Sequence, residues 1–324
     1  MITITSEKIQ EWSKTWHKGP LSDAVLDAVE SNKDVVVLAA DLAMAVGVYD
    51  CIKYEGQYFN LGIAEQNMLG VACGLAKEGK IPVATSFVPF IALRAFEQVR
   101  TSAAYMNLNV KMIGTNAGVR GGKAGTSHYG LEDITLMRSV PGMTVLSPSD
   151  GLCMYKAIRA MIDCPGPAWL RAAGVPEVPI LYKEDFDYRI GEAIKHRDGE
   201  EVAMFATGPM VARALEAAGA LAERGIEAAV YDVHTIKPLD EQAVLGAAEK
   251  ARLVVTLEEN TVIGGLGGAV AELLAQSGTG ARLKILGLMD RFMKIAAYED
   301  QLRKCGLMPD QIAETVLEGL GQAK

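Results

Sequence analysis

The chain has 324 residues, half of them hydrophobic, and a net charge of −8 from 32 Lys and Arg against 40 Asp and Glu. This length suffices for two domains with their own cores. The negative charge, without a basic stripe, argues against binding of nucleic acid or of an anionic membrane surface. No secretory signal and no apolar run of membrane-spanning length is visible. The five cysteines show no paired spacing, which indicates reduced packing residues, so we expect a cytoplasmic protein.

Strand-like and helix-like runs alternate through the first half of the chain. The run at 34–40 is continuously apolar, which is typical of a strand buried on both faces. We predict further strands at 81–85, 110–114, 143–146 and 168–171, and helices at 22–31, 63–78, 90–105, 131–139 and 151–162. Such alternation predicts right-handed βαβ units and a mainly parallel sheet.

A polar connector at 176–201 interrupts this pattern, and a second α/β unit follows it. In this unit we predict strands at 201–206, 226–233 and 253–257. We predict helices within 208–225, after the glycine run 264–268, and at 309–320. The predicted fold class is therefore α/β, with two three-layer α/β domains at 1–190 and 191–324.

Glu65 begins an otherwise apolar helix that is rich in small residues, within the run 58–72. A buried carboxylate is costly to ionise unless it is paired, so an acid in such a place is usually held for a function. The alternative is a first-turn glutamate that faces solvent and is favoured by the helix dipole. Helical spacing alone leaves both interpretations open.

The loop 116–128 is glycine-dense and basic and ends at His128. Glycines allow a backbone to approach a ligand closely, although a flexible surface loop would look similar. Asp41 and Arg171 each end a predicted strand, where open α/β sheets place ligands. Arginine suits bidentate phosphate binding. The alternative for Arg171 is a solvated arginine at a strand end, and the alternative for Asp41 is an N-cap or turn acid.

The glycine run 264–268 lacks the G-x-G-x-x-G spacing of a dinucleotide site, and no acidic residue follows a strand about twenty residues on. We therefore expect tight packing between loop and helix there. The acidic word Glu258-Glu259-Asn260, just before it, is expected to be structural and not catalytic.

Four segments in order carry a family resemblance: the Glu65 run, Phe87-Val88-Pro89-Phe90, Gly125-Thr126-Ser127-His128 and the segment 141–150. Together they resemble the pyrimidine-binding domain of thiamine-diphosphate enzymes of the transketolase family, and the remainder resembles the transketolase C-terminal domain. The resemblance implies that Glu65 hydrogen-bonds N1′ of the aminopyrimidine ring. It implies that Phe87 and Phe90 hold this ring and that Asp41 lies near the thiazolium and the substrate. It further implies that His128 stabilises an oxyanion of the substrate and that Arg171 binds its phosphate.

The sequence departs from the family pattern mainly where the substrate is expected. Transketolases carry a second histidine at the substrate-facing position of Asn116, an aspartate at Ala124 and a phosphate-binding serine at Ala45. An arginine expected near Gly19 and a tyrosine expected near Leu93 are also missing. The resemblance is therefore weaker toward the substrate than toward the cofactor.

The family's Gly-Asp-Gly motif, which holds the diphosphate through a divalent metal on a separate domain, does not occur in this chain. We therefore predict the C-terminal (β) subunit of a split transketolase, without metal ligands of its own. A partner subunit would hold the diphosphate and Mg²⁺ or Ca²⁺, in an α2β2 assembly. The predicted reaction belongs to carbohydrate metabolism and transfers a two-carbon ketol unit from a ketose to an aldose. The sequence does not decide whether these sugars are phosphorylated.

Three alternatives remain. A 1-deoxyxylulose-5-phosphate synthase-like half shares the Ile-Ala-Glu-Gln word at 63–66, and a 2-oxoacid dehydrogenase E1 β-subunit shares the two-domain plan. The loop of His128 together with Arg171 favours sugar phosphates over oxoacids. The third alternative is a non-catalytic regulatory subunit, and the presence of Glu65, Phe90 and His128 argues against it.

Overall fold

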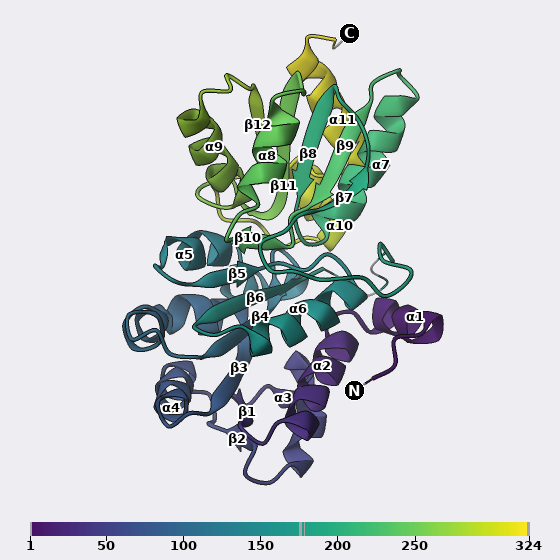
Figure 1. Ribbon diagram of the computed structural model, residues 1–324. Helices are drawn as coiled ribbons and strands as arrows, with labels where there is room; N and C mark the ends of the chain where they lie inside the picture. Colours follow the sequence, from purple (N-terminus) through teal and green to yellow (C-terminus); the bar gives the residue numbers. More distant parts are fainter. Residues whose placement is uncertain (1, 175–176, 178, 323–324) are drawn as a thin grey trace.

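The structure of the chain is a computed structural model that describes residues 2–174, 177 and 179–322 (Figure 1). Its strands are β1 Val35–Ala39, β2 Tyr58–Asn60, β3 Ile81–Phe87, β4 Lys111–Ala117, β5 Thr144–Leu146, β6 Ala168–Ala173, β7 Ile194–Arg197, β8 Val202–Ala206, β9 Ala228–Asp232, β10 Thr235–Lys237, β11 Leu253–Thr261 and β12 Leu283–Leu288. Its α-helices are α1 Ser6–Thr15, α2 Lys18–Ser31, α3 Ala43–Val46, α4 Glu65–Lys77, α5 Asp133–Ser139, α6 Gly151–Asp163, α7 Met210–Ala222, α8 Glu241–Ala248, α9 Leu266–Ser277, α10 Tyr298–Lys304 and α11 Pro309–Leu320. Pro89–Arg94 and Gln98–Ala104 are π-helical.

The strands form two sheets. The first sheet has seven strands in the order β10-β5-β6-β4-β3-β1-β2, and the second has five in the order β12-β11-β8-β9-β7. All neighbours pair in parallel except β10 with β5 and β7 with β9. The predicted mainly parallel α/β fold is confirmed.

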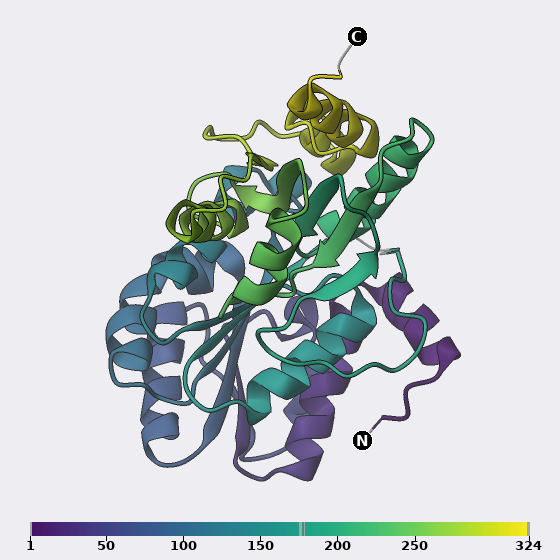
Figure 2. The same ribbon diagram turned by 45° about the horizontal axis from the view of Figure 1, so that its top comes forward.

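Helices cover both faces of each sheet because the strands bury apolar side chains on both sides. In the first sheet, α2 and α6 pack on one face, while α4, α5 and the two π-helical segments pack on the other (Figure 2). In the second sheet, α7 and α11 cover one face, and α8 and α9 cover the other. The predicted pair of three-layer α/β units is therefore confirmed.

The predicted polar connector at 176–201 includes a short strand. Its residues 176 and 178 lie outside the described residues, but 194–197 form the edge strand β7, antiparallel to β9. The chain then returns to the first sheet, where β10 adds an antiparallel strand to β5. The two halves are thus joined by a shared sheet as well as by the connector, and a domain boundary at residue 190 stays a prediction.

The predicted helix at 90–105 is also different, because it divides into two π-helical segments, the first of which begins at Pro89. Such π-helical turns often occur at functional sites. All five cysteines are free and four of them are buried, which agrees with the expected packing role. Within the described residues, no helix is both long and apolar enough to cross a membrane.

Candidate active site

Glu65 is the first residue of α4, and its side chain is only 1% exposed. One carboxylate oxygen, Oε2, accepts a hydrogen bond from Arg94 Nη1 at 2.9 Å. The other, Oε1, accepts from the buried hydroxyl of Ser86 at 3.3 Å. The solvent-facing alternative for Glu65 is therefore wrong, and the residue is a buried, paired acid at the carboxyl end of the sheet.

Three aromatic rings lie together at this edge. Phe87 ends β3 and Phe90 lies on the first π-helical segment, and their ring centres are 6.0 Å apart. The imidazole of His128 approaches both, at 5.5 Å from Phe90 and 6.2 Å from Phe87. The guanidinium carbon of Arg94 is 4.6 Å from the centre of the Phe90 ring. The structure thus brings the acid, the aromatic residues and the histidine of the sequence prediction to one place.

The loop that carries His128 is fastened to the second sheet and is not a free surface loop. The backbone N–H of Val119 donates to the Glu259 carboxylate on β11 at 2.9 Å. Gly118 has φ +70°, and a Cβ atom there would lie 1.9 Å from the same carboxylate, so glycine is required for this contact. The His128 ring itself is oriented by the Ser127 hydroxyl, 3.0 Å from Nδ1.

Asp41 and Asn116 lie at the ends of β1 and β4 with left-handed backbones, φ 59° and 57°. Aspartate and asparagine tolerate this conformation better than most residues, and it concentrates at functional sites. The side chain of Asn60, at the end of β2, accepts from the N–H groups of Asp41 and Gly62 at 3.0 Å each. Because β4, β3, β1 and β2 are neighbours, Asn116, Phe87 and Asp41 occupy one edge of the sheet. Their roles toward a ligand stay predictions.

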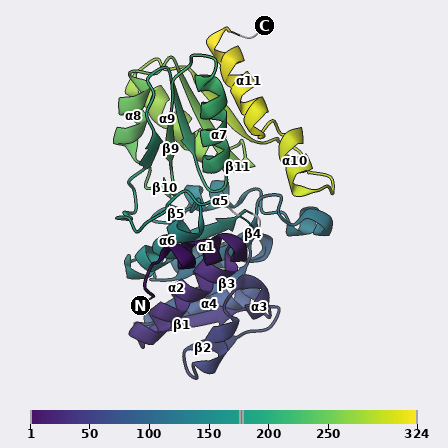
Figure 3. The same ribbon diagram turned by 90° about the vertical axis from the view of Figure 1, so that its right-hand side faces the viewer.

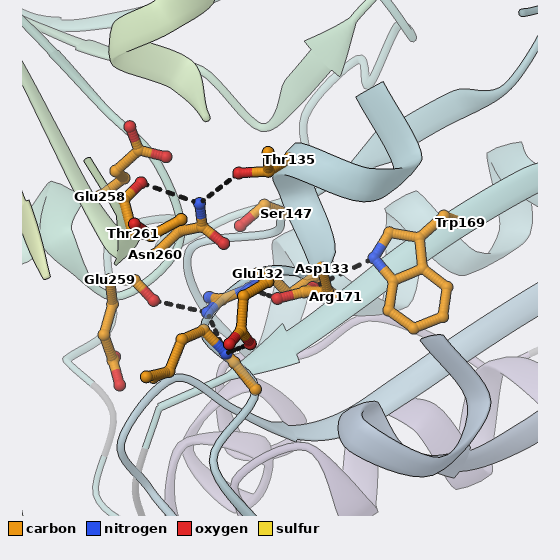
Figure 4. A network of polar contacts seen from close by, with 12 residues as sticks. Glu132, Asp133, Thr135, Ser147, Trp169, Arg171, Glu258, Glu259, Asn260 and Thr261 are labelled. Carbon is orange, nitrogen blue, oxygen red and sulfur yellow. Dashed lines mark hydrogen bonds and ion pairs between the residues drawn. The ribbon is translucent and has the colours of Figure 1, made fainter. Parts of the chain in front are cut away.

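Arg171 lies elsewhere, inside the junction between β6, α5 and β11 (Figure 4). Its side chain is 1% exposed, and Nε pairs with Asp133 at 3.1 Å. Its Nη2 donates to the carbonyl oxygens of Gly130 and Glu259. The expected contact with a substrate phosphate does not fit this position, because the guanidinium is enclosed by protein. Arg171 instead fastens the second half of the chain to the first sheet.

The acidic segment Glu258-Glu259-Asn260, just before the glycine run, has the expected structural role. The Glu258 carboxylate accepts from the N–H groups of Leu266 and Gly267 at 2.9 and 2.8 Å, at the start of α9. Burial raises the pKa of Glu258 to about 7, against the lowering effect of these two hydrogen bonds. A carboxylate of the protein thus occupies the helix N-terminus where a dinucleotide phosphate would bind. Tight packing between loop and helix is confirmed.

Sequence reasoning missed Arg94, Ser86 and Asn60, which position the predicted residues. Arg94 follows Phe90 by four residues, a spacing that places two side chains on one helical face, so this contact was accessible from the sequence. The contacts of Ser86 and Asn60 join segments that lie about twenty residues apart, and no local pattern indicates them.

Two family descriptions match the chain: the transketolase pyrimidine-binding domain over residues 15–173 and the transketolase C-terminal domain over residues 191–312. A 6-deoxy-6-sulfo-D-fructose transketolase subunit of Clostridium sp. (strain MSTE9) is 39% identical over 304 residues, covering 94% of this chain and 94% of that protein. An apulose-4-phosphate transketolase subunit of Phocaeicola vulgatus is 34% identical over 299 residues, covering 92% and 95%. A solved split-gene transketolase, described as an inactive β4 tetramer, matches with a TM-score of 0.83 and 35% identity over 94% of this chain and 98% of that one. The chain therefore belongs to the transketolase family, as a counterpart of the C-terminal or β subunits of its split members.

Proposed function

We propose that this chain is the β subunit of a thiamine-diphosphate-dependent split transketolase and supplies the pyrimidine side of an active site shared with a partner subunit. The observation that carries this proposal is the convergence of Glu65, Phe90 and His128 at one sheet edge. The relatives named as transketolase subunits, and the split-gene structure, support the same assignment.

The donor set fits the aminopyrimidine ring of thiamine diphosphate. Phe87 and Phe90 offer apolar faces for a flat ring. The Glu65 carboxylate, which Arg94 links to the Phe90 ring, can hold a proton at ring N1′. When bound, the cofactor supplies the carbon nucleophile and electron sink for breaking and forming carbon–carbon bonds. His128 would donate to the substrate oxygen on which negative charge develops, and Asp41 and Asn116 would bind sugar hydroxyl groups.

The described residues do not fit the diphosphate and metal end of the cofactor. Among them, no group of three or more His, Cys, Asp or Glu is placed to hold a metal ion. A hard divalent cation that bridges a diphosphate needs several oxygen ligands. We therefore propose that the diphosphate, with Mg²⁺ or Ca²⁺, is held by a partner subunit in an α2β2 assembly. The inactivity of the split-gene β4 tetramer supports this dependence on a partner.

The proposed reaction moves a two-carbon ketol unit from a ketose to an aldose, at least one of which carries a terminal anionic group. The names of the two relatives, for a sulfonated ketose and for a phosphorylated sugar, support an anionic substrate without choosing between phosphate and sulfonate. Both relatives match over nearly their whole length, which favours ketol transfer over the oxoacid alternatives. The intact pairing of Glu65 argues against a non-catalytic subunit.

The experiment that tests this proposal is Glu65→Gln in the enzyme assembled with its partner subunit. The change keeps the shape of the side chain but removes its ability to hold a proton, so kcat should fall about a hundredfold or more. Glu78→Gln is the matched control, since Glu78 is an exposed residue at the opposite end of α4. Near-normal kcat in Glu65→Gln would contradict the proposed role.

A further inference from the structure

The burial of Arg171 leaves the anionic end of the proposed substrate without its expected partner, so another cation of the neighbouring loops would have to bind it. Arg94 is already paired with Glu65. Lys18 lines a groove together with Glu11, Asp23 and Asp50, and these acids would repel an anion. Lys123, on the loop of His128, is exposed to solvent. Such a side chain positions an anion less well than a cation that the fold holds in place.

Arg120 differs from these cations because it is held in place but has no ion-pair partner among the residues that the structure describes. It lies on the loop between β4 and α5, and this loop passes near α10 (Figure 3). Its guanidinium carbon is 4.1 Å from the centre of the Trp16 ring. Trp16 is 6% exposed, and its indole N–H donates to the Ala173 carbonyl at the end of β6, which fixes this stacking surface. The Nε atom of Arg120 is buried without a hydrogen-bond partner. The Glu259 carboxylate attracts Arg120 electrostatically, but its two oxygens accept hydrogen bonds from the Val119 N–H group and the Tyr298 hydroxyl.

The surroundings place Arg120 beside the carboxyl edge of the first sheet. His17 follows Trp16, is fully buried, and its Nε2 lies 3.4 Å from the carbonyl oxygen of Ala45 on α3. The α3 helix begins two residues after Asp41, at the end of β1. Burial lowers the pKa of His17 to about 3, and the charges of Lys18 and Arg120 add to this lowering. The guanidinium therefore lies on the loop of His128 and beside the Trp16–His17 segment, which contacts α3.

A half-buried cation without a partner is unfavourable, and an anion that binds it relieves this cost. Stacking on an aromatic ring holds the guanidinium plane while its N–H edge stays free for two parallel hydrogen bonds, the arrangement in which arginine binds phosphate. We infer that Arg120 binds the terminal tetrahedral oxyanion, phosphate or sulfonate, of the sugar substrate. This inference rests on the proposed function, and it assigns the enzyme's preference for anionic sugars to a residue of this chain.

The test compares three ketoses in the assembled enzyme: fructose 6-phosphate, 6-deoxy-6-sulfofructose and fructose. Arg120→Gln should lower kcat/KM for the two anionic sugars roughly ten- to a hundredfold, as expected for losing a charge-assisted hydrogen-bond pair, and leave fructose within about twofold. Lys123→Gln, which removes a cation from the same loop, should change none of the three. The two anionic sugars distinguish phosphate from sulfonate as the preferred group.

An equal loss for all three sugars, or no loss for any, would overturn the assignment of Arg120. A second measurement keeps the assignment testable without turnover: line broadening of inorganic phosphate in phosphorus NMR with the full chain. Arg120→Gln should abolish the broadening and Lys123→Gln should retain it, whereas broadening that persists in Arg120→Gln would contradict the inference. An assembled wild type that transfers no ketol unit from any of the three sugars would instead contradict the proposed function.

Discussion

Arg94 touches the same two groups that are proposed to receive the cofactor ring. Its guanidinium is a flat group with N–H donors, stacked near Phe90 and bonded to Glu65. Half of its side chain is exposed, while that of Glu65 is almost fully buried, so Arg94 lies on the solvent side of the acid. Arg94 therefore occupies contacts that a bound aminopyrimidine ring would need.

We accordingly predict that Arg94→Gln strengthens binding of thiamine diphosphate to the assembled enzyme. The gain should be up to about fivefold, since a partly exposed ion pair contributes no more than about 1 kcal/mol. Quenching of tryptophan fluorescence during cofactor titration measures it. Arg100→Gln, at an exposed arginine of the next π-helical segment, is the control and should have no effect. Weaker binding in Arg94→Gln would contradict this interpretation and make Arg94 a part of the loaded site.

Single residues also show where sequence reasoning reaches its limit. The burial of Glu65 and its meeting with Phe90 and His128 could be anticipated, because the resembling segments carry these residues in a fixed order. The enclosure of Arg171 could not, since a strand end reveals nothing about whether α5 and β11 cover it. The contact of Arg120 with the Trp16 ring could not be anticipated either, because Trp16 lies more than a hundred residues away along the chain.

At the scale of elements, the junction of β6, α5 and β11 holds the two halves of the chain together. The buried Asp133 carboxylate accepts hydrogen bonds from Nε of Arg171 and, at 3.2 Å, from Nε1 of Trp169. Arg171 also reaches the carbonyl oxygen of Glu259 on β11, whose carboxylate anchors the loop of His128. One buried ion pair thus connects the packing of the two sheets with the position of a proposed catalytic loop.

Arg171→Ala should therefore destabilise the fold and should not act on substrate choice. Leaving Asp133 buried without its partner costs about 3–5 kcal/mol in the free energy of unfolding, measured by denaturant titration. Arg252→Ala, which breaks the surface pair with Glu201, should cost less than about 1 kcal/mol. A stable Arg171→Ala variant with weakened binding of phosphorylated sugars alone would instead restore the phosphate role suggested by the family resemblance.

The elements that the sequence predicted are those with strong burial. The strands β1, β8 and β11 are buried over nearly their whole length, so their apolar runs are continuous and easy to recognise. The edge strands β2 and β7 are short and partly exposed, and their polar residues resemble a loop. The π-helical segments have the apolar spacing of an α-helix, so the sequence could not distinguish them from one.

For the whole molecule, a buried acid at the meeting of the two halves links stability to pH. Asp232, at the end of β9, accepts hydrogen bonds from Ser149 and from Tyr182 of the connector. Burial raises the pKa of Asp232 to about 7, against the lowering effect of these hydrogen bonds. The folded chain thus binds a proton that the unfolded chain, with an aspartate pKa of about 3.9, has already lost.

Stability from Asp232 is therefore fully present below about pH 4 and is lost as the pH rises through about 7. Relative to Asp232→Asn, the wild type should lose on the order of 1–2 kcal/mol of unfolding free energy between pH 6 and pH 8. Denaturant titrations of both proteins at the two pH values measure this difference. The pKa of Glu258 is raised into the same range, but Glu258 is present in both proteins, so its contribution cancels in the comparison. Parallel pH dependences would contradict a raised pKa at Asp232.

As one half of an enzyme, the chain should need its partner subunit for activity, and assembly with that subunit tests this most directly. The measurement is ketol transfer with saturating thiamine diphosphate and Mg²⁺, first with this chain alone and then as the partner subunit is added. We predict no turnover from the chain alone and activity that rises with added partner until the two are equimolar. Full turnover by this chain without its partner would contradict the split-enzyme account.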